Sequence, residues 1–187
     1  MEPEKLPNID QLVSDLNQKI ENNLCGLNMK QLHWVSSVTS DYLRTNGFDI
    51  DDSSKRIDDL GNSLLHLLVQ VRDVNPLKLL VSKFSNVNTR NDRGETPLHI
   101  ACKLGNQPAA AILLSFFADV NAKDNDGNTP LMNVARRKNP SISFLDFLLE
   151  KQADLCLENK FRQKAWDIAT SIKSNGKVLK LLNPYYR

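Results

Sequence analysis

The sequence is poor in the residues and motifs on which catalytic and metal-binding proteins depend. It has 3 cysteines, at positions 25, 102 and 156, with no CxxC pair, and this odd, scattered set predicts no disulfide framework. Of the 3 histidines, only His99 lies near a cysteine, Cys102, and the surrounding stretch predicts a core helix. No G-x-S-x-G, P-loop or G-x-G-x-x-G motif occurs. We therefore expect a protein that is not an enzyme and that binds no metal or cofactor.

Long hydrophobic runs are absent as well. The longest apolar-rich stretch, residues 109–118, is much shorter than the ~20 residues that a membrane-spanning helix needs. Acidic residues and a proline stand at the start of the chain, where a secretory signal would have a basic segment and an apolar core. Together with unpaired cysteines, these features lead us to expect a cytoplasmic and/or nuclear protein without a membrane partner.

Charge is unevenly distributed although the net charge is only +2. The first 60 residues carry 11 acidic and 6 basic residues, a net charge of −5, whereas the rest of the chain carries 11 acidic and 18 basic residues, a net charge of +7. The basic part could steer an acidic partner towards the protein. Alternatively, the two parts are solvated surfaces that attract each other, and the sequence leaves both possibilities open.

What the sequence does contain is a repeat of 33 residues. Gly94 is followed by E-T-P-L-H-I-A, and Gly127, 33 positions later, is followed by N-T-P-L. Gly61, 33 positions before Gly94, precedes N-S-L-L-H. This period and the T-P-L-H-x-A pattern are those of ankyrin repeats, and the chain resembles the ankyrin-repeat family. The resemblance implies an all-α solenoid of helix-turn-helix repeats with projecting β-turn loops.

The repeat predicts the organisation of the chain. We expect an N-terminal helical segment with a degenerate capping repeat over residues 1–59 and an ankyrin-repeat domain over 60–187. The units of that domain are about 60–92, 93–125 and 126–160, followed by a C-terminal cap at 161–187. The third unit is two residues longer, because Ala118-Asp119 recurs as Ala153-Asp154, 35 positions later. Atypical end units cover the apolar faces that a solenoid would otherwise expose.

The N-terminal segment shows helical spacing without the repeat. Apolar residues at i, i+3 and i+4 predict helices over residues 8–24 and 28–45. The following G-F-D-I-D, residues 47–51, resembles the G-A-D-V-N ending of an ankyrin unit, which suggests the degenerate repeat. Whether these helices cap the solenoid or contact a partner stays open.

In the unit 93–125, Thr96 is expected to cap the inner helix and Pro97 to take its first position. The outer helix of the preceding unit should run from Pro76 to Phe84, and its inner helix from Ser63 to about Val71. Apolar residues of the unit 93–125 are expected to face inward or to contact neighbouring units: Leu98, Ala101, Leu104, Ile112, Leu113, Phe116 and Phe117.

The resemblance also gives His66 and His99 a role, because this histidine ties adjacent turns together by hydrogen bonds in ankyrin units. Two positions depart from the family pattern. Met132 stands where the histidine is expected, and Arg162 stands where the turn glycine is expected. We therefore expect altered hydrogen bonding at the first position and a less tight turn at the second.

A stack of helix pairs makes a long concave surface of the kind that binds proteins. The resemblance implies a non-catalytic protein–protein interaction module that acts as an inhibitor or regulatory subunit, monomeric or in a hetero-complex. We expect the partner to contact the turn tips and the exposed ends of inner helices. These residues are Asn88, Thr89, Arg90, Asn91, Arg93, Lys123, Asn125, Lys160 and Arg162 on the turns, and Arg72, Lys103, Arg136 and Arg137 on the helices.

Several partners fit this size and pattern. An IκB-like inhibitor of a Rel/NF-κB-type transcription factor is the favoured specific case. A cell-cycle kinase regulatory subunit, similar to the four-repeat cyclin-dependent kinase inhibitors, is an alternative, as is a scaffold or substrate adaptor. The basic cluster at residues 136–138 lacks interleaved aromatics, so it favours a solvated face or an acidic protein contact over nucleic acid. No small-molecule substrate is expected.

Overall fold

The computed structural model describes residues 56, 58–70, 74–174 and 176–183. Within these ranges the chain forms helices joined by turns, without a β-strand. The predicted N-terminal helices and the degenerate capping repeat lie outside the described residues. The described helices are α3 (Leu64–Leu68), α4 (Asn75–Leu80), α5 (Pro97–Leu104), α6 (Gln107–Ser115), α7 (Pro130–Ala135), α8 (Ile142–Glu150), α9 (Ala165–Ser171) and α10 (Gly176–Leu182), with a 3-10 helix, η1, at Val81–Lys83.

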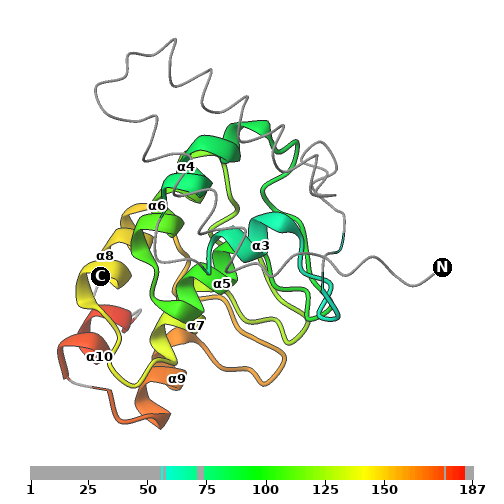
Figure 1. Cartoon of the computed structure of the whole chain (residues 1–187). Coiled ribbons are helices and arrows are strands. Elements are labelled where there is room, and N and C mark those ends of the chain that lie inside the picture. Colours follow the sequence, from blue (N-terminus) through cyan, green and yellow to red (C-terminus); the bar gives the residue numbers. More distant parts are fainter. Residues whose placement is uncertain (1–55, 57, 71–73, 175, 184–187) are drawn as a thin grey trace, which may run out of the picture.

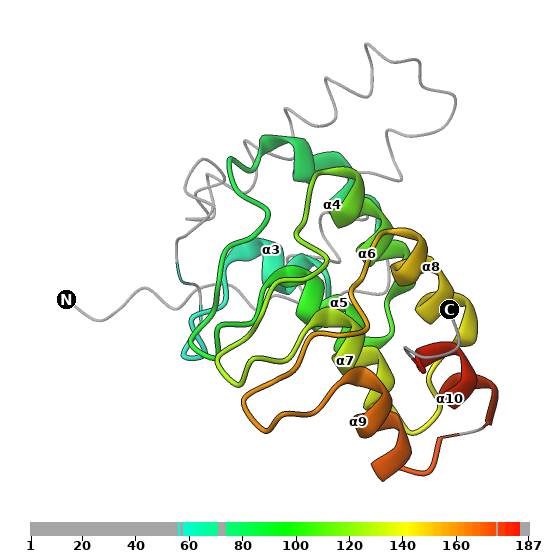
Figure 2. The same ribbon diagram turned by 180° about the vertical axis from the view of Figure 1, so that it is seen from behind.

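The helices lie in two rows. The outer helices α4, α6 and α8 form one row, and the inner helices α3, α5, α7 and α9 form the other, with long turns projecting beyond the inner row (Figure 1; Figure 2). An inner helix packs against its own outer helix and against the next inner helix, as α5 does with α6 and α7. At the C-terminal end, α10 packs on α8 and α9. This arrangement confirms the predicted all-α solenoid of helix-turn-helix repeats.

Local chemistry sets the helix ends. Pro97 and Pro130 take the first positions of α5 and α7, where a missing backbone N–H costs no hydrogen bond. Gly105 ends α5 in the left-handed conformation, at φ 76°. The side chain of Asn106 then caps α6 by accepting a hydrogen bond from the N–H of Ala109 at 3.1 Å. The chain therefore reverses direction within two residues, which brings α6 back along α5.

The core runs through the whole stack between the two rows of helices. Burying a leucine side chain completely stabilises the fold by about 1.5–3 kcal/mol. Ala101 and Ala169, both fully buried on inner helices, leave room for neighbouring helices to approach. The leucines at equivalent core positions are also fully buried: Leu65, Leu98 and Leu131 on the inner helices, and Leu80, Leu113 and Leu148 on the outer helices.

Three apolar residues that the sequence assigns to the interior are exposed instead. Leu104 is 48% exposed, Phe116 38% and Phe117 90%. A helix turns by about 100° per residue, so Leu104 points about 120° away from Leu98, which is buried. The two phenylalanines follow the end of α6 at Ser115, so they lie in a turn and no longer on the buried helix face.

The first described repeat also has shorter helices than the sequence predicts. The outer helix ends at Leu80 and continues as the 3-10 helix η1, where two weak helix formers, Val81 and Ser82, stand together. The inner helix α3 ends at Leu68. The C-terminal helix α10 lies within the predicted C-terminal cap, residues 161–187. None of the helices described has the length and apolar character needed to cross a membrane.

Candidate protein-binding surface

The projecting turns at residues 58–62, 91–95, 124–128 and 159–163, here called finger turns, share one construction. In the turn 91–95, Asn91 Oδ1 accepts hydrogen bonds from the N–H groups of Arg93 at 3.0 Å and Glu95 at 2.9 Å. Asp124 Oδ1 likewise accepts hydrogen bonds from the N–H groups of Asp126 at 2.9 Å and Asn128 at 2.8 Å. One side-chain oxygen thus satisfies two backbone donors and fixes each turn locally.

The first and last side chains of each finger turn also bind each other; in the first three turns the acid and the amide exchange places from turn to turn, and the last turn pairs two amides. The pairs are Asp58 with Asn62, Asn91 with Glu95, Asp124 with Asn128, and Asn159 with Gln163. The amides then reach between turns: Asn91 Nδ2 donates to Asn62 Oδ1 and Asn159 Nδ2 to Asn128 Oδ1, each at 3.0 Å. Asn125 Nδ2 also donates to the carbonyl oxygen of Asp92 at 2.8 Å, so each finger turn is bonded to the next.

These bonds correct two of the predicted partner-binding residues. Asn91 is buried and uses its side chain to hold its own turn and the preceding one. Thr89 is buried too, and its hydroxyl lies 3.2 Å from that of Ser63. Both positions look like exposed polar turn residues in the sequence, but their hydrogen-bonding groups are already used within the protein. We therefore remove them from the proposed contact surface.

The histidines have the structural role that the family resemblance implies. His66 Nε2 lies 2.9 Å from the carbonyl oxygen of Glu95, and His99 Nε2 lies 3.0 Å from that of Asn128. His99 Nδ1 accepts from the N–H of Thr96, the N-cap residue of α5, at 3.1 Å. Because Nδ1 accepts, the neutral ring carries its proton on Nε2 and donates it to the next finger turn.

Burial lowers the pKa of both His66 and His99 below the ordinary value, while the hydrogen bonds to the carbonyl oxygens oppose this change. The third unit lacks this link, because the side chain of Met132 has no N–H to donate. The N–H of Thr129 lies 3.4 Å from the sulfur of Met132 instead. The predicted change in hydrogen bonding at this position is therefore present.

The turn at Arg162 differs from what the sequence predicts. Arg162 adopts the left-handed conformation, at φ 59°, as the glycines at this turn position do. Its N–H donates to the carbonyl oxygen of Asn159 at 3.0 Å, and Gly127 makes the equivalent bond to Asp124, also at 3.0 Å. The turn is therefore as tight as the others, and the arginine carries the steric cost that a glycine avoids.

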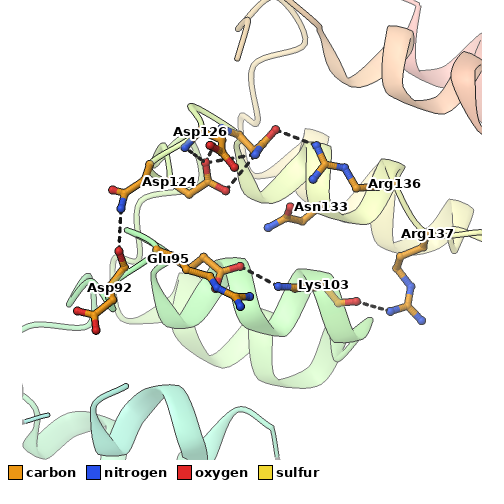
Figure 3. Close-up of a pocket in the computed structure, with 11 residues that line it drawn as sticks. Asp92, Glu95, Lys103, Asp124, Asp126, Asn133, Arg136 and Arg137 are labelled. Atoms are coloured by element: carbon orange, nitrogen blue, oxygen red, sulfur yellow. Dashed lines mark hydrogen bonds and ion pairs between the residues drawn. The ribbon is translucent and has the colours of Figure 1, made fainter. Parts of the chain in front are cut away.

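A groove of about 660 Å³ lies between finger turns 91–95 and 124–128 and helices α5 and α7. We call it the finger groove. Its turn side carries the carboxylates of Asp92, Asp124 and Asp126, and its helix side carries cationic side chains (Figure 3). The turn side also carries Arg93, and Asp92 is ion-paired with Arg56. On balance the turn side is therefore acidic and the helix side basic. The cations come from Lys103 on α5 and from the C-terminal end of α7, where Arg136 and Arg137 stand.

The cations differ in how far they are neutralised within the protein. Lys103 Nζ lies 3.0 Å from Glu95 Oε1, whose residue is only 6% exposed. Arg136 Nη2 donates to the neutral amide oxygen of Asn128 at 2.9 Å, and Arg137 Nη1 donates to the carbonyl oxygen of Lys103 at 2.6 Å. Among the described residues, neither arginine has a carboxylate within ion-pair distance. On the helix side, the guanidinium groups of Arg136 and Arg137 therefore have no direct ion pair with the described residues.

The finger groove brings together part of the predicted partner-binding set and leaves the rest outside. Asn88 is half-buried and bonds the next repeat, and Arg72 lies outside the described residues. Lys123 is exposed, with Nζ 3.0 Å from the carbonyl oxygen of Glu158. The predicted residues that line the groove are Arg93, Lys103, Asn125, Arg136 and Arg137, whereas Arg90, Lys160 and Arg162 are exposed elsewhere.

Sequence reasoning missed the acidic wall and one aromatic residue. The predicted contact residues include no acidic side chain, although Asp92, Asp124 and Asp126 all stand in turns that the repeat locates. Phe161, at the tip of the last finger turn, is 69% exposed. Its position, one residue before Arg162, aligns with Arg93 and was the signal that could have identified it.

A family model described as ankyrin repeats (3 copies) matches residues 35–124 and 65–159. The two matches together extend from residue 35 to residue 159, which is well over half of the 187 residues. They include the part of the chain where the sequence predicts the degenerate repeat. No curated protein matches the chain. With its repeated helix pairs and linked finger turns, this chain belongs to the ankyrin-repeat family.

Proposed function

We propose that this protein binds an acidic segment of another protein in the finger groove and so acts as an inhibitor or regulatory subunit. Ankyrin repeats mediate binding to other proteins, and proteins built from them are generally non-catalytic interaction modules. The observation that carries the proposal is the pair of uncompensated guanidinium groups of Arg136 and Arg137 on the helix side of the groove.

Guanidinium groups suit this role because each can bind a carboxylate with two parallel hydrogen bonds. Opposite charges 4 Å apart near a protein surface attract by about 4 kcal/mol before desolvation and side-chain ordering reduce the gain. A contact at the rim of an interface finally contributes about 1 kcal/mol or less, largely through the association rate. The acidic turn wall, at the same time, repels a partner segment that presents carboxylates on its other side, which fixes the orientation.

Within this proposal, the favoured specific case is IκB-like inhibition of a Rel/NF-κB-type transcription factor in the cytoplasm or nucleus. It rests on the resemblance of the repeat pattern to that of ankyrin inhibitors. The alternatives are a cell-cycle kinase regulatory subunit and a scaffold or substrate adaptor. Two assays distinguish the first case from the kinase alternative: a Rel-dependent reporter assay and a kinase assay with purified complex. Only the activity of the matching target should change when this protein is added.

The groove itself is tested by charge reversal. The double variant Arg136→Glu, Arg137→Glu is compared with Lys177→Glu, Lys180→Glu, which makes the same charge change at exposed positions on α10. The probe is a phage-displayed library of random linear peptides. Wild-type protein and the α10 variant should enrich peptides rich in Asp and Glu, whereas the groove variant should lose them. Equal enrichment by the groove variant, or no excess of acidic peptides for the wild type, would contradict the proposal.

A further inference from the structure

A second surface feature lies at the opposite end of the repeat from the finger turns. Phe117 follows the end of α6, with its backbone in the left-handed conformation at φ 63°. The residue is 90% exposed, and the adjacent Phe116 is 38% exposed. A single exposed phenylalanine does not by itself indicate a binding site, because single apolar residues are common on protein surfaces. Here two adjacent aromatic residues are exposed, whereas the equivalent positions of the next repeat are Lys151 and Gln152.

The left-handed conformation here is imposed by the end of the helix. The N–H of Ala118 donates to the carbonyl oxygen of Leu113 at 3.0 Å, and the N–H of Phe117 donates to that of Leu114 at 3.3 Å. These two bonds form a helix-ending motif whose left-handed residue is usually glycine, since a side chain there clashes with the backbone. Asn88 Nδ2 of the preceding repeat also donates to the carbonyl oxygen of Phe117, at 3.4 Å.

The next repeat provides a direct comparison. Gln152 occupies the equivalent position with φ 66°, and Ala153 N–H bonds the carbonyl oxygen of Leu148 at 3.0 Å. Asn121 Nδ2 donates to the carbonyl oxygen of Gln152 at 3.1 Å, just as Asn88 Nδ2 binds Phe117. The scaffold is thus the same in both repeats. Only at Phe117 does it display a large apolar ring, and the fold gains no burial from that ring.

The left-handed conformation is common to both repeats, so the exposed aromatic pair is what distinguishes this helix end from the next. We propose that Phe117, supported by Phe116, is an aromatic anchor that inserts into an apolar pocket of a partner protein. Rigid aromatic side chains bury a large area at little entropic cost, and they commonly dominate interfaces. The anchor stands apart from the finger groove, because the end of α6 presents it and the finger turns do not.

The charges around the anchor indicate the rim of that pocket. The positions equivalent to Phe116 in the two flanking repeats are Lys83 and Lys151, and both lysines are exposed. Neither has a carboxylate within ion-pair distance among the described residues. Lys151 Nζ instead lies 5.8 Å from the centre of the Phe147 ring. Asp119, two residues after Phe117, is exposed as well. A pocket that receives the aromatic pair should therefore be apolar inside and carry carboxylates on the sides of its edge that face the two lysines, and not on the side that faces Asp119.

The test compares Phe117→Gly with Gln152→Gly in the full-length chain. Glycine relieves the left-handed residue in both, so both variants should raise the melting temperature by about 2–4 °C. The partner is identified first, by placing the photocrosslinker 4-benzoylphenylalanine at position 117 or 152 and mapping the crosslinked residues. Crosslinks from position 117 alone should map to apolar residues of another protein, flanked by Asp or Glu.

With that protein in hand, Phe117→Gly should weaken its binding by about tenfold or more, and Gln152→Gly should leave the affinity unchanged. Unchanged affinity of the Phe117→Gly variant would overturn the proposal. So would crosslinks to this chain itself, or a lower melting temperature for that variant, because either result means that the ring packs within the same chain. A change in oligomeric state on Phe117→Gly substitution would assign the anchor to a second copy and overturn it as well.

Discussion

The free energy of unfolding should fall as the pH is lowered from about 7.5 to about 5.5, because two buried histidines stay neutral in the folded protein. His66 and His99 are fully buried, and burial lowers the pKa of each ring below its ordinary value. The unfolded chain titrates near the ordinary pKa of about 6.5. Below that pH the unfolded state therefore binds more protons than the folded state, and acid favours unfolding.

The size of the effect follows from the linkage relation. The contribution of each ring is fully present above about pH 6.5 and is lost as the pH falls from there towards the lowered pKa of the folded state. A ring that stays neutral throughout costs about 1 kcal/mol between pH 6.5 and 5.5, so the two together cost up to about 2 kcal/mol. Urea titrations followed by circular dichroism at each pH measure this change.

The control replaces both histidines with the residue that the third unit has at the equivalent position. Met132 occupies the equivalent position in the third unit and packs there fully buried, so the variant His66→Met, His99→Met removes both titrating groups with a side chain that the fold accommodates. His33 lies outside the described residues and is present in both proteins, so it cancels in the comparison. The variant should be less stable at pH 7.5, because it loses the links to Glu95 and Asn128. Equal loss of stability between pH 7.5 and 5.5 in both proteins would refute the reasoning.

Two further predictions concern the positions that depart from the family pattern. Arg162→Gly should raise the free energy of unfolding by about 1 kcal/mol, because glycine adopts φ 59° without the clash of a side chain. Urea titration measures this change. The control variant, Arg136→Gly, lies at an αR position and should not gain stability. Met132→His should add a hydrogen bond to the carbonyl oxygen of Gln163 and stabilise the protein by about 1 kcal/mol at pH 7.5. The stability of this variant should also fall more steeply towards pH 5.5. An unchanged dependence of stability on pH would show that the new ring does not make this hydrogen bond.

Much of the fold could be predicted because the repeat signals are local. Pro97 at the start of a helix and Gly105 at its end act through their own backbone geometry, so the sequence reveals them directly. Leu104 and Phe117 were misplaced because inward orientation depends on where a helix ends and on how far its face has rotated, which a pattern of apolar residues does not fix. The division of the chain at residues 59 and 60 stays a prediction.

The candidate site was only partly predictable for a different reason. Arg136 and Arg137 could be found as a basic cluster, but their lack of carboxylate partners depends on the folded surroundings, where Arg136 bonds Asn128 of its own unit and Arg137 bonds Lys103 of the preceding unit. Asn91 and Thr89 look like exposed turn residues, yet their bonds to the preceding turn bury them. Arg162 shows the opposite case, since hydrogen bonds around a turn can hold an arginine where the sequence pattern calls for glycine.

The exchange of acid and amide between successive finger turns has a consequence for how such an array can be lengthened or shortened. The turn beginning at Asn91 binds back to Asn62, and the turn beginning at Asn159 binds back to Asn128. Between these two links, Glu95 and Asp124 are both carboxylates, and the connection runs instead from Asn125 Nδ2 to the carbonyl oxygen of Asp92 at 2.8 Å. Removing or inserting two units together keeps the native alternation of these two kinds of boundary, whereas removing one unit creates a boundary that the protein does not contain. The natural unit for grafting or for building chimaeras of this protein is therefore a tandem of 66 to 68 residues, the span that separates Gly61 from Gly127 and Asn91 from Asn159.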